Sequence, residues 1–337
     1  MNLYETEKIC KMSLIGKKIL NRIFGTFFSS ISLLLFKSNY TSSKSVSIVE
    51  KFFKKNKFLE KLLINRSFRN MLDQMQPRFL QDLNEIDDFP SITVVIPCHP
   101  KDFSLIQSVV DGLIDNSLNP IQEILIITPR ELKPEVKSKV KISFLQDDDL
   151  LNPEIVKNIN SEFSNENSGW IRQQVIKIRT VLVYVSTKYA LVLDSDTVLL
   201  APRLFATEQY QELSFASEYH EPYFAHVKRF NSSIVDTSLS FVTHHQVWNT
   251  SLVNEIWGGI KLTQWIEARD KRQTSCVSEY QTYGQFIISN YSDNYRLTRW
   301  GNAEFSRKVQ DDFGDVNYLD LKKRFPMNLS VSIHSYS

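Results

Sequence analysis

The chain is short of glycine, and this shortage excludes several kinds of nucleotide and nucleophile site. It has 9 glycines among 337 residues, well below the roughly 7% that is usual in proteins. None of them stands in a G-x-G-x-x-G, G-x-x-x-x-G-K-[ST] or G-x-S-x-G pattern. The dinucleotide fingerprint, the P-loop and the hydrolase nucleophile elbow are therefore absent. A nucleotide that binds this chain must be held without a glycine-rich loop.

Cysteine is scarce as well. The three cysteines, Cys10, Cys98 and Cys276, lie far apart, which excludes a disulfide framework and a cysteine-rich zinc site. The composition is otherwise that of a globular protein, with 42% apolar and 23% charged residues. The length is sufficient for one large α/β domain or two modest ones.

The formal net charge of +2 hides an asymmetry between the two parts of the chain. Residues 1–70 hold 14 Lys and Arg against 4 Asp and Glu, whereas the remainder holds 26 against 34. Such an asymmetry indicates segments with different partners. We therefore expect a basic, helical N-terminal region over 1–89 and an α/β domain over 90–337.

The basic region contains the most apolar run of the chain, residues 23–36. As a helix this run would span roughly 21 Å, too short for a hydrocarbon core of about 30 Å, and no small-residue cleavage site follows it. Two interpretations remain open: an anchor lying in the plane of an anionic membrane surface, or a helical hairpin packed on the α/β domain. The first would make the protein cytoplasmic and peripheral on the inner face of the membrane.

From residue 90 onward, short apolar runs alternate with a helical pattern. Runs over 92–98, 123–128 and 141–145 are typical of buried strands, and 103–114 has helical spacing. This order predicts a mostly parallel sheet flanked by helices. Ligands bind such sheets at the carboxyl ends of the strands, so Pro97 and His99 become candidate binding residues.

The next helix and strand are the most informative. Residues 170–187 carry one apolar stripe, and the apolar strand 189–193 follows. Trp170, Gln173 and Lys177 lie together on a neighbouring face of this helix and are candidate binding residues. That strand runs into Asp194-Ser195-Asp196.

Strand alternation would point both carboxylates to one side, where they would repel each other unless a cation lay between them. Mn²⁺ or Mg²⁺ suits such oxygen ligands and is commonly completed by substrate phosphates. The alternative is that one aspartate caps the following turn while the other is exposed.

Four ordered segments, at 169–177, 194–197, 241–246 and 278–284, follow the strand "SITVVIPCHPKD". Together they resemble a little-characterised group of bacterial glycosyltransferase-like proteins with a GT-A-type fold, in which a D-x-D motif ends a central strand. The resemblance implies a GT-A-like Rossmann-type sheet. It also implies metal-dependent transfer of a sugar from a nucleoside diphosphate donor to a glycan or lipid-linked acceptor.

The resemblance also suggests roles for single residues. Asp194 and Asp196 would hold the metal ion that binds the diphosphate, Asp196 taking part in catalysis, and Ser195 would lie against the nucleotide. Lys177, or one of Arg172 and Arg179, would add a second positive contact, unless these are only surface residues of a helix.

A third metal ligand in this family is often a histidine, for which His244, His245 and His334 are the candidates. Neighbours on a strand face opposite ways, so at most one of His244 and His245 should reach the site.

Glu279 is the candidate catalytic base, with Glu218 a weaker rival. Ser278 before it is placed to cap a helix, and the alternative for Glu279 is a favourable interaction with that helix N-terminus.

Two other functions stay open. A nucleotidyltransferase of similar fold would use the same sheet and metal, although the loop after the first strand lacks glycine. A non-catalytic, membrane-associated binding protein would keep the fold without the reaction. Nucleic acid is not an expected partner, because the basic residues concentrate in the N-terminal segment.

Overall fold

The computed structural model describes residues 89–337 apart from 152, 161–164, 217–218, 235–238, 271, 274, 292–293, 307–316, 327 and 335–337. All of these belong to one compact unit, which is assigned to Ser42–Ser337. The basic segment and its apolar run at 23–36 lie outside the described residues, as does Glu218, so the expectations for them remain predictions. Among the described helices, none has the length and apolar character needed to cross a membrane.

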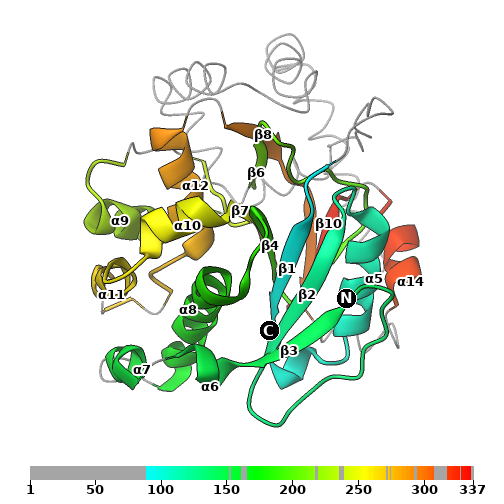
Figure 1. The fold of residues 1–337 in the computed structure, drawn as a ribbon, viewed down its shortest axis with the longest axis horizontal. Coiled ribbons are helices and arrows are strands. Elements are labelled where there is room, and N and C mark those ends of the chain that lie inside the picture. The colour runs from blue at the N-terminus through cyan, green and yellow to red at the C-terminus, as the bar shows by residue number, and fades with distance from the viewer. Residues whose placement is uncertain are drawn as a thin grey trace, which may run out of the picture. The chain divides into compact units, whose positions relative to one another are not determined.

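A five-stranded sheet forms the centre of the unit (Figure 1). Its order is β3-β2-β1-β4-β7, made by Ile142–Gln146, Ile121–Thr128, Ile92–Pro97, Tyr189–Leu193 and His245–Asn249. The first four strands run parallel, and β7 pairs antiparallel with β4. The predicted α/β class with a mostly parallel sheet is confirmed.

Helices cover both faces of this sheet because its strands are apolar on both sides. Within β1, Ile92, Val94 and Ile96 join one core cluster and Val95 joins the other, as period-two alternation requires. The first cluster also takes apolar residues of α5, Ile106–Asn116. The second takes the apolar stripe of α8, Asn165–Tyr184.

The remaining helices are short and lie around these two cores (Figure 1). They are the single-turn η1 (Pro100–Asp102), α6 (Asp147–Leu150), α7 (Pro153–Asn160), α9 (Glu221–Phe230), α10 (Thr250–Trp257), α11 (Lys261–Glu267), α12 (Glu279–Asn290) and α14 (Tyr318–Arg324). One of them begins as the sequence predicts: Ser278 caps α12 by accepting from the N–H of Gln281 at 3.1 Å.

Two smaller sheets bring late parts of the chain beside the central one. One has the order β5-β10-β9, made by Thr197–Leu199, Ser330–His334 and Asn302–Ser306, and the other pairs β6 (Gln211–Phe215) with β8 (Tyr295–Arg299). Because β5 starts directly after the D-S-D segment and β10 pairs with it antiparallel, the end of β10 reaches the carboxyl edge of β4. The N–H of Ile333 donates to the carbonyl of Asp196 at 2.8 Å.

Candidate active site

A cavity of about 870 Å³ opens at the carboxyl ends of β1 and β4. The sequence-predicted residues that line it are Pro97, His99, Trp170, Gln173, Lys177, Asp194, Ser195, Asp196, His244, Glu279 and His334. They come from six separate parts of the chain. Such a volume is within the range of ligand sites, and the position is the usual one for parallel α/β sheets.

The D-S-D segment forms a turn, so the predicted strand-like geometry is wrong. The N–H of Thr197 donates to the carbonyl of Asp194 at 3.1 Å, which ends the extended conformation at Leu193. Ser195 is buried, and its hydroxyl donates to Asp102 Oδ2 at 2.7 Å. The flanking side chains, Asp194 and Asp196, both line the cavity.

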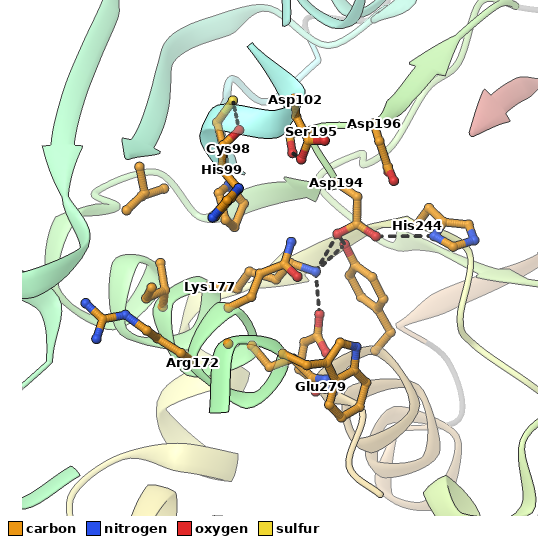
Figure 2. A pocket seen from close by; sticks show the side chains of 18 of the residues that line it. Cys98, His99, Asp102, Arg172, Lys177, Asp194, Ser195, Asp196, His244 and Glu279 are labelled. Atoms are coloured by element: carbon orange, nitrogen blue, oxygen red, sulfur yellow. Dashed lines mark hydrogen bonds and ion pairs between the residues drawn. The ribbon is translucent and has the colours of Figure 1, made fainter. Parts of the chain in front are cut away.

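Lys177 lies at the centre of a buried network of hydrogen bonds and ion pairs next to Asp194 (Figure 2). Its ammonium group donates to Asp194 Oδ1 at 2.5 Å, to Glu279 Oε1 at 2.7 Å and to the Tyr280 hydroxyl at 3.2 Å. Tyr280 in turn donates to Asp194 Oδ1 at 3.1 Å. An ammonium group has three protons, so all of them are engaged by protein groups and none is left for the predicted phosphate contact.

The pKa values in this network follow from burial and pairing. Burial alone would lower the pKa of Lys177, but Asp194 and Glu279 raise it above its ordinary value. Burial would raise the pKa of Asp194, yet Lys177 and His244 hold it below its usual range. For Glu279, burial outweighs Lys177, and its pKa is raised. The first two groups are therefore an ion pair at neutral pH, while Glu279 holds its proton more strongly than an ordinary glutamate.

Each aspartate of the D-S-D turn contacts its own imidazole. Asp194 Oδ2 lies 3.3 Å from His244 Nδ1, and Asp196 Oδ2 lies 3.1 Å from His334 Nδ1. The two rings are neighbours, with centroids 5.1 Å apart. His334, one of the three candidates for a third ligand, therefore lies beside the acidic turn, because β10 pairs with β5.

His245, which the sequence placed among the binding residues, does not line this cavity. It is 1% exposed, its Nδ1 lies 2.9 Å from the carbonyl of Thr243, and its ring packs against Trp300 with centroids 3.9 Å apart. Burial lowers the pKa of His245 to about 3. The correction has a simple cause: β7 begins at His245, so the two histidines point in different directions.

His244 precedes that strand and has a φ of 60°, a left-handed conformation that is uncommon outside glycine. Its carbonyl accepts from the N–H of Asp194 at 2.9 Å. This backbone contact joins the loop before β7 to the carboxyl end of β4. It therefore places the His244 ring at the D-S-D turn.

The two arginines proposed for phosphate contact have other partners. Arg172 binds Asp147 at 3.1 Å and Asp148 at 2.5 Å, and Arg179 donates to the carbonyl of Leu150 at 3.2 Å. Arg172 still lines the cavity, while Arg179 is not among its lining residues.

Trp170 lines the same cavity wall and stacks on Tyr223, with ring centroids 5.8 Å apart. The four later tryptophans, Trp248, Trp257, Trp265 and Trp300, are fully buried. They serve the core, and none of them lines this cavity.

Three residues of the site were missed by the sequence reasoning. Asp102 holds Ser195, Tyr280 bridges Lys177 and Asp194, and Glu304 Oε1 lies 3.9 Å from His244 Nε2. Asp102 lies in η1, just after the carboxyl end of β1, where ligand-binding residues are expected in such a sheet, so its position could have identified it. Tyr280 stands in the S-E-Y-x-x-Y-G segment, which drew attention only to Glu279. No local pattern identifies Glu304, because it meets the site only through the pairing of β9 with β10.

The donor atoms at the turn fit a divalent transition ion. Asp196 offers a carboxylate, which suits Mn²⁺ among the transition ions, and His334 an imidazole, which suits the later ones. The 3.1 Å between Asp196 Oδ2 and His334 Nδ1 is close to the roughly 3.0 Å that separates adjacent ligands at bond lengths of about 2.1 Å. Asp194 fits less well, because its two oxygens already accept from Lys177, Tyr280 and His244.

Neither the known protein-family models nor the curated proteins give a match to this chain. Among solved structures, the apo crystal structure of mouse xyloside xylosyltransferase 1 is similar in fold. The alignment has a TM-score of 0.41 and 9% sequence identity, and it covers 72% of this chain and 97% of that one.

Proposed function

We propose that this protein is a metal-dependent glycosyltransferase that moves a sugar from a nucleoside diphosphate donor to a hydroxyl of a glycan or lipid-linked acceptor. The observation that carries the proposal is the pairing of the D-S-D turn with two neighbouring imidazoles, Asp194 with His244 and Asp196 with His334, on the wall of a large cavity. Adjacent carboxylate and imidazole groups suit a divalent ion, and divalent ion sites are commonly completed by substrate phosphates.

The charges of the cavity wall support the need for a metal ion. Lys177 is engaged by Asp194 and Glu279, and Arg172 by Asp147. Two of the cations that line the cavity are therefore already paired with carboxylates. A divalent ion at Asp196 and His334 would supply the positive charge that stabilises the departing nucleoside diphosphate.

The remaining roles are assigned to this chain's own residues. In the transfer, the bond between the sugar and the diphosphate breaks, a bond from the acceptor oxygen to the sugar forms, and the acceptor hydroxyl loses its proton. We assign that proton to Glu279, whose raised pKa brings it closer to the working range of a base. Pro97, His99 and the Ser195–Asp102 pair border the side of the cavity next to β1, where we place the nucleoside.

Trp170 and Gln173 lie on α8 and line the same cavity. We assign them to the sugar side of the donor, because an aromatic face and an amide together suit a ring that carries hydroxyl groups. For the N-terminal segment we retain the proposal of a peripheral membrane contact on the cytoplasmic face. Its net positive charge suits anionic lipid.

A thermal-shift panel tests donor binding directly. The full chain is heated with UDP-, GDP- or CMP-linked sugars, with and without Mn²⁺, beside the variant Asp196→Asn. Asp115→Asn is the matched control, since Asp115 is exposed and does not line the cavity. Ligand binding to the native state raises its melting temperature. We expect a Mn²⁺-dependent shift with UDP- or GDP-linked sugars, which carry a diphosphate, in the wild type and the control, and none in Asp196→Asn.

Two results would overturn the proposal. An unchanged shift in Asp196→Asn would mean that the ion binds elsewhere. A shift with a free nucleoside triphosphate but with no nucleotide sugar would favour a nucleotidyltransferase.

A further inference from the structure

One part of the cavity is bounded by residues that lie away from the central sheet. α12 contacts both β7 and α9, and α9 lies further from the central sheet (Figure 1). Four side chains form this part, which we call the α9 wall: Trp170, His220, Tyr223 and Ser275. The chain continues from Ser275 into Glu279, the first residue of α12. The α9 wall is therefore connected to the residue to which we assign the acceptor's proton.

Contacts with Ser275 hold two rings of the α9 wall in place. Its carbonyl oxygen lies 2.6 Å from His220 Nε2, and its hydroxyl lies 2.8 Å from the hydroxyl of Tyr223. The rings of His220 and Tyr223 meet edge to face with centroids 4.5 Å apart. Tyr223 in turn stacks on Trp170 with an angle of 9° between the ring planes. The three rings are thus ordered before a ligand binds, which lowers the entropic cost of binding.

The contact with Ser275 also determines what His220 offers to a ligand. A carbonyl oxygen can only accept, so the Nε2 atom of His220 carries the proton in that hydrogen bond. In a neutral imidazole the other nitrogen then has a lone pair, and Nδ1 is a hydrogen-bond acceptor. A hydroxyl group is a suitable donor to it. An acceptor atom beside aromatic rings fits a sugar, which carries both hydroxyl groups and an apolar C–H face.

The positive charges of the cavity are not on the α9 wall. Among the described residues that line the cavity, the lysines and arginines are Lys101, Arg172 and Lys177. Lys101 belongs to η1, next to β1, and Arg172 and Lys177 pair with carboxylates. A phosphate group at the α9 wall would lack the charged hydrogen-bond donors that such groups usually have. A neutral sugar needs no such donor.

We propose that the α9 wall binds a neutral sugar ring of the acceptor, with the C–H face of the ring toward the aromatic side chains and one of its hydroxyl groups donating to His220 Nδ1. This inference rests on the proposed function for the reaction. It names a glycan terminus, in place of a lipid phosphate, as the group that receives the transferred sugar. Trp170 lies at the boundary with the donor sugar, because the acceptor oxygen must reach the carbon to which the diphosphate is bound.

Saturation-transfer difference NMR on the full chain tests this binding without any turnover. The aromatic protons of the protein are irradiated, and the probes are the methyl glycosides of glucose, galactose, mannose and xylose, with farnesyl phosphate as the lipid phosphate. We expect saturation of the C–H protons of at least one glycoside and none of farnesyl phosphate. Removing one hydroxyl from that glycoside should weaken binding about three- to tenfold in the wild type. In His220→Phe the same removal should cause no further loss, since the hydroxyl has then already lost its partner.

Glu221→Gln is the matched control, because Glu221 is exposed beside His220 and does not line the cavity. Melting curves establish that each variant folds, and His220→Phe should keep the thermal shift with a nucleotide sugar and Mn²⁺.

Three results would refute the sugar subsite and leave the proposed function in place: no binding of any glycoside, binding of farnesyl phosphate alone, or an equal loss on hydroxyl removal in the wild type and in His220→Phe. If a glycoside binds through His220 but no nucleotide sugar ever gives a thermal shift, the proposed function fails and the sugar subsite remains.

Discussion

Replacing Lys177 by methionine should destabilise the protein more than any other single loss of a positive charge that we consider. Lys177 is 4% exposed and binds Glu279, which is 3% exposed, and Asp194, which is 16% exposed. Solvent therefore screens these contacts little. Removing the ammonium group leaves two buried carboxylates without their shared partner, for which we expect a loss of about 3–5 kcal/mol in the free energy of unfolding.

The assay is urea denaturation of the metal-free protein, followed by the fluorescence of its buried tryptophans. Lys188→Met is the matched control, because the Lys188–Glu208 pair is exposed on both sides and should contribute less than about 1 kcal/mol. The double variant Lys177→Met/Glu279→Gln should recover part of the loss, since one of the two orphaned charges is then absent.

The sign of the pH dependence gives a second check. Without Lys177, the pKa of Glu279 in the folded state rises further above its ordinary 4.5. A carboxyl with a raised folded-state pKa costs stability as pH rises above its unfolded-state value. The deficit of Lys177→Met should therefore be larger at neutral pH than near pH 4.5. A deficit no larger than that of Lys188→Met at neutral pH would refute the buried network.

Three further outcomes are expected. Gly284→Ala should lower the free energy of unfolding by about 1–3 kcal/mol in the same urea titration, because a Cβ at this position would lie 2.1 Å from the Phe241 ring. Gly169→Ala is the control and should cost nothing measurable, because no atom lies within 4 Å of a Cβ there. Burial lowers the pKa of His226 to about 4, so the stability of the wild type should fall as the pH drops from 6.5 toward 4. Melting curves at several pH values should show a smaller fall for His226→Gln, because this variant has no imidazole to protonate at that position. Glu279→Gln should lower turnover by roughly 10²–10⁴ while donor binding persists; unchanged turnover would remove the base assignment.

Local features of this fold were predictable from the sequence because short-range physics determines them. The apolar stripe of 170–187 predicts α8, and Ser278 caps α12 by accepting from Gln281. The apolar strand before Asp194 predicts where β4 ends. In each case the residues that decide the outcome are within a few positions of one another.

Features that depend on distant partners were not predictable in the same way. Lys177 contacts Glu279 across 102 positions of the chain, and no local pattern shows that a carboxylate is its partner in place of a phosphate. The D-S-D turn is closed by the hydrogen bond from the N–H of Thr197 to the carbonyl of Asp194, but the partner of Ser195 within it, Asp102, is 93 positions away. Glu304 enters the site only through the register of β9 with β10.

Release of nucleoside diphosphate from a nucleotide sugar tests the central claim most directly. A sugar transferase commonly passes its donor's sugar slowly to water, so the full chain with Mn²⁺ and the donor that gives the thermal shift should release nucleoside diphosphate. Asp196→Asn should release at least tenfold less, and Asp115→Asn should match the wild type. Release of nucleoside monophosphate and sugar 1-phosphate in place of nucleoside diphosphate, or equal release by Asp196→Asn, would contradict sugar transfer at this metal site.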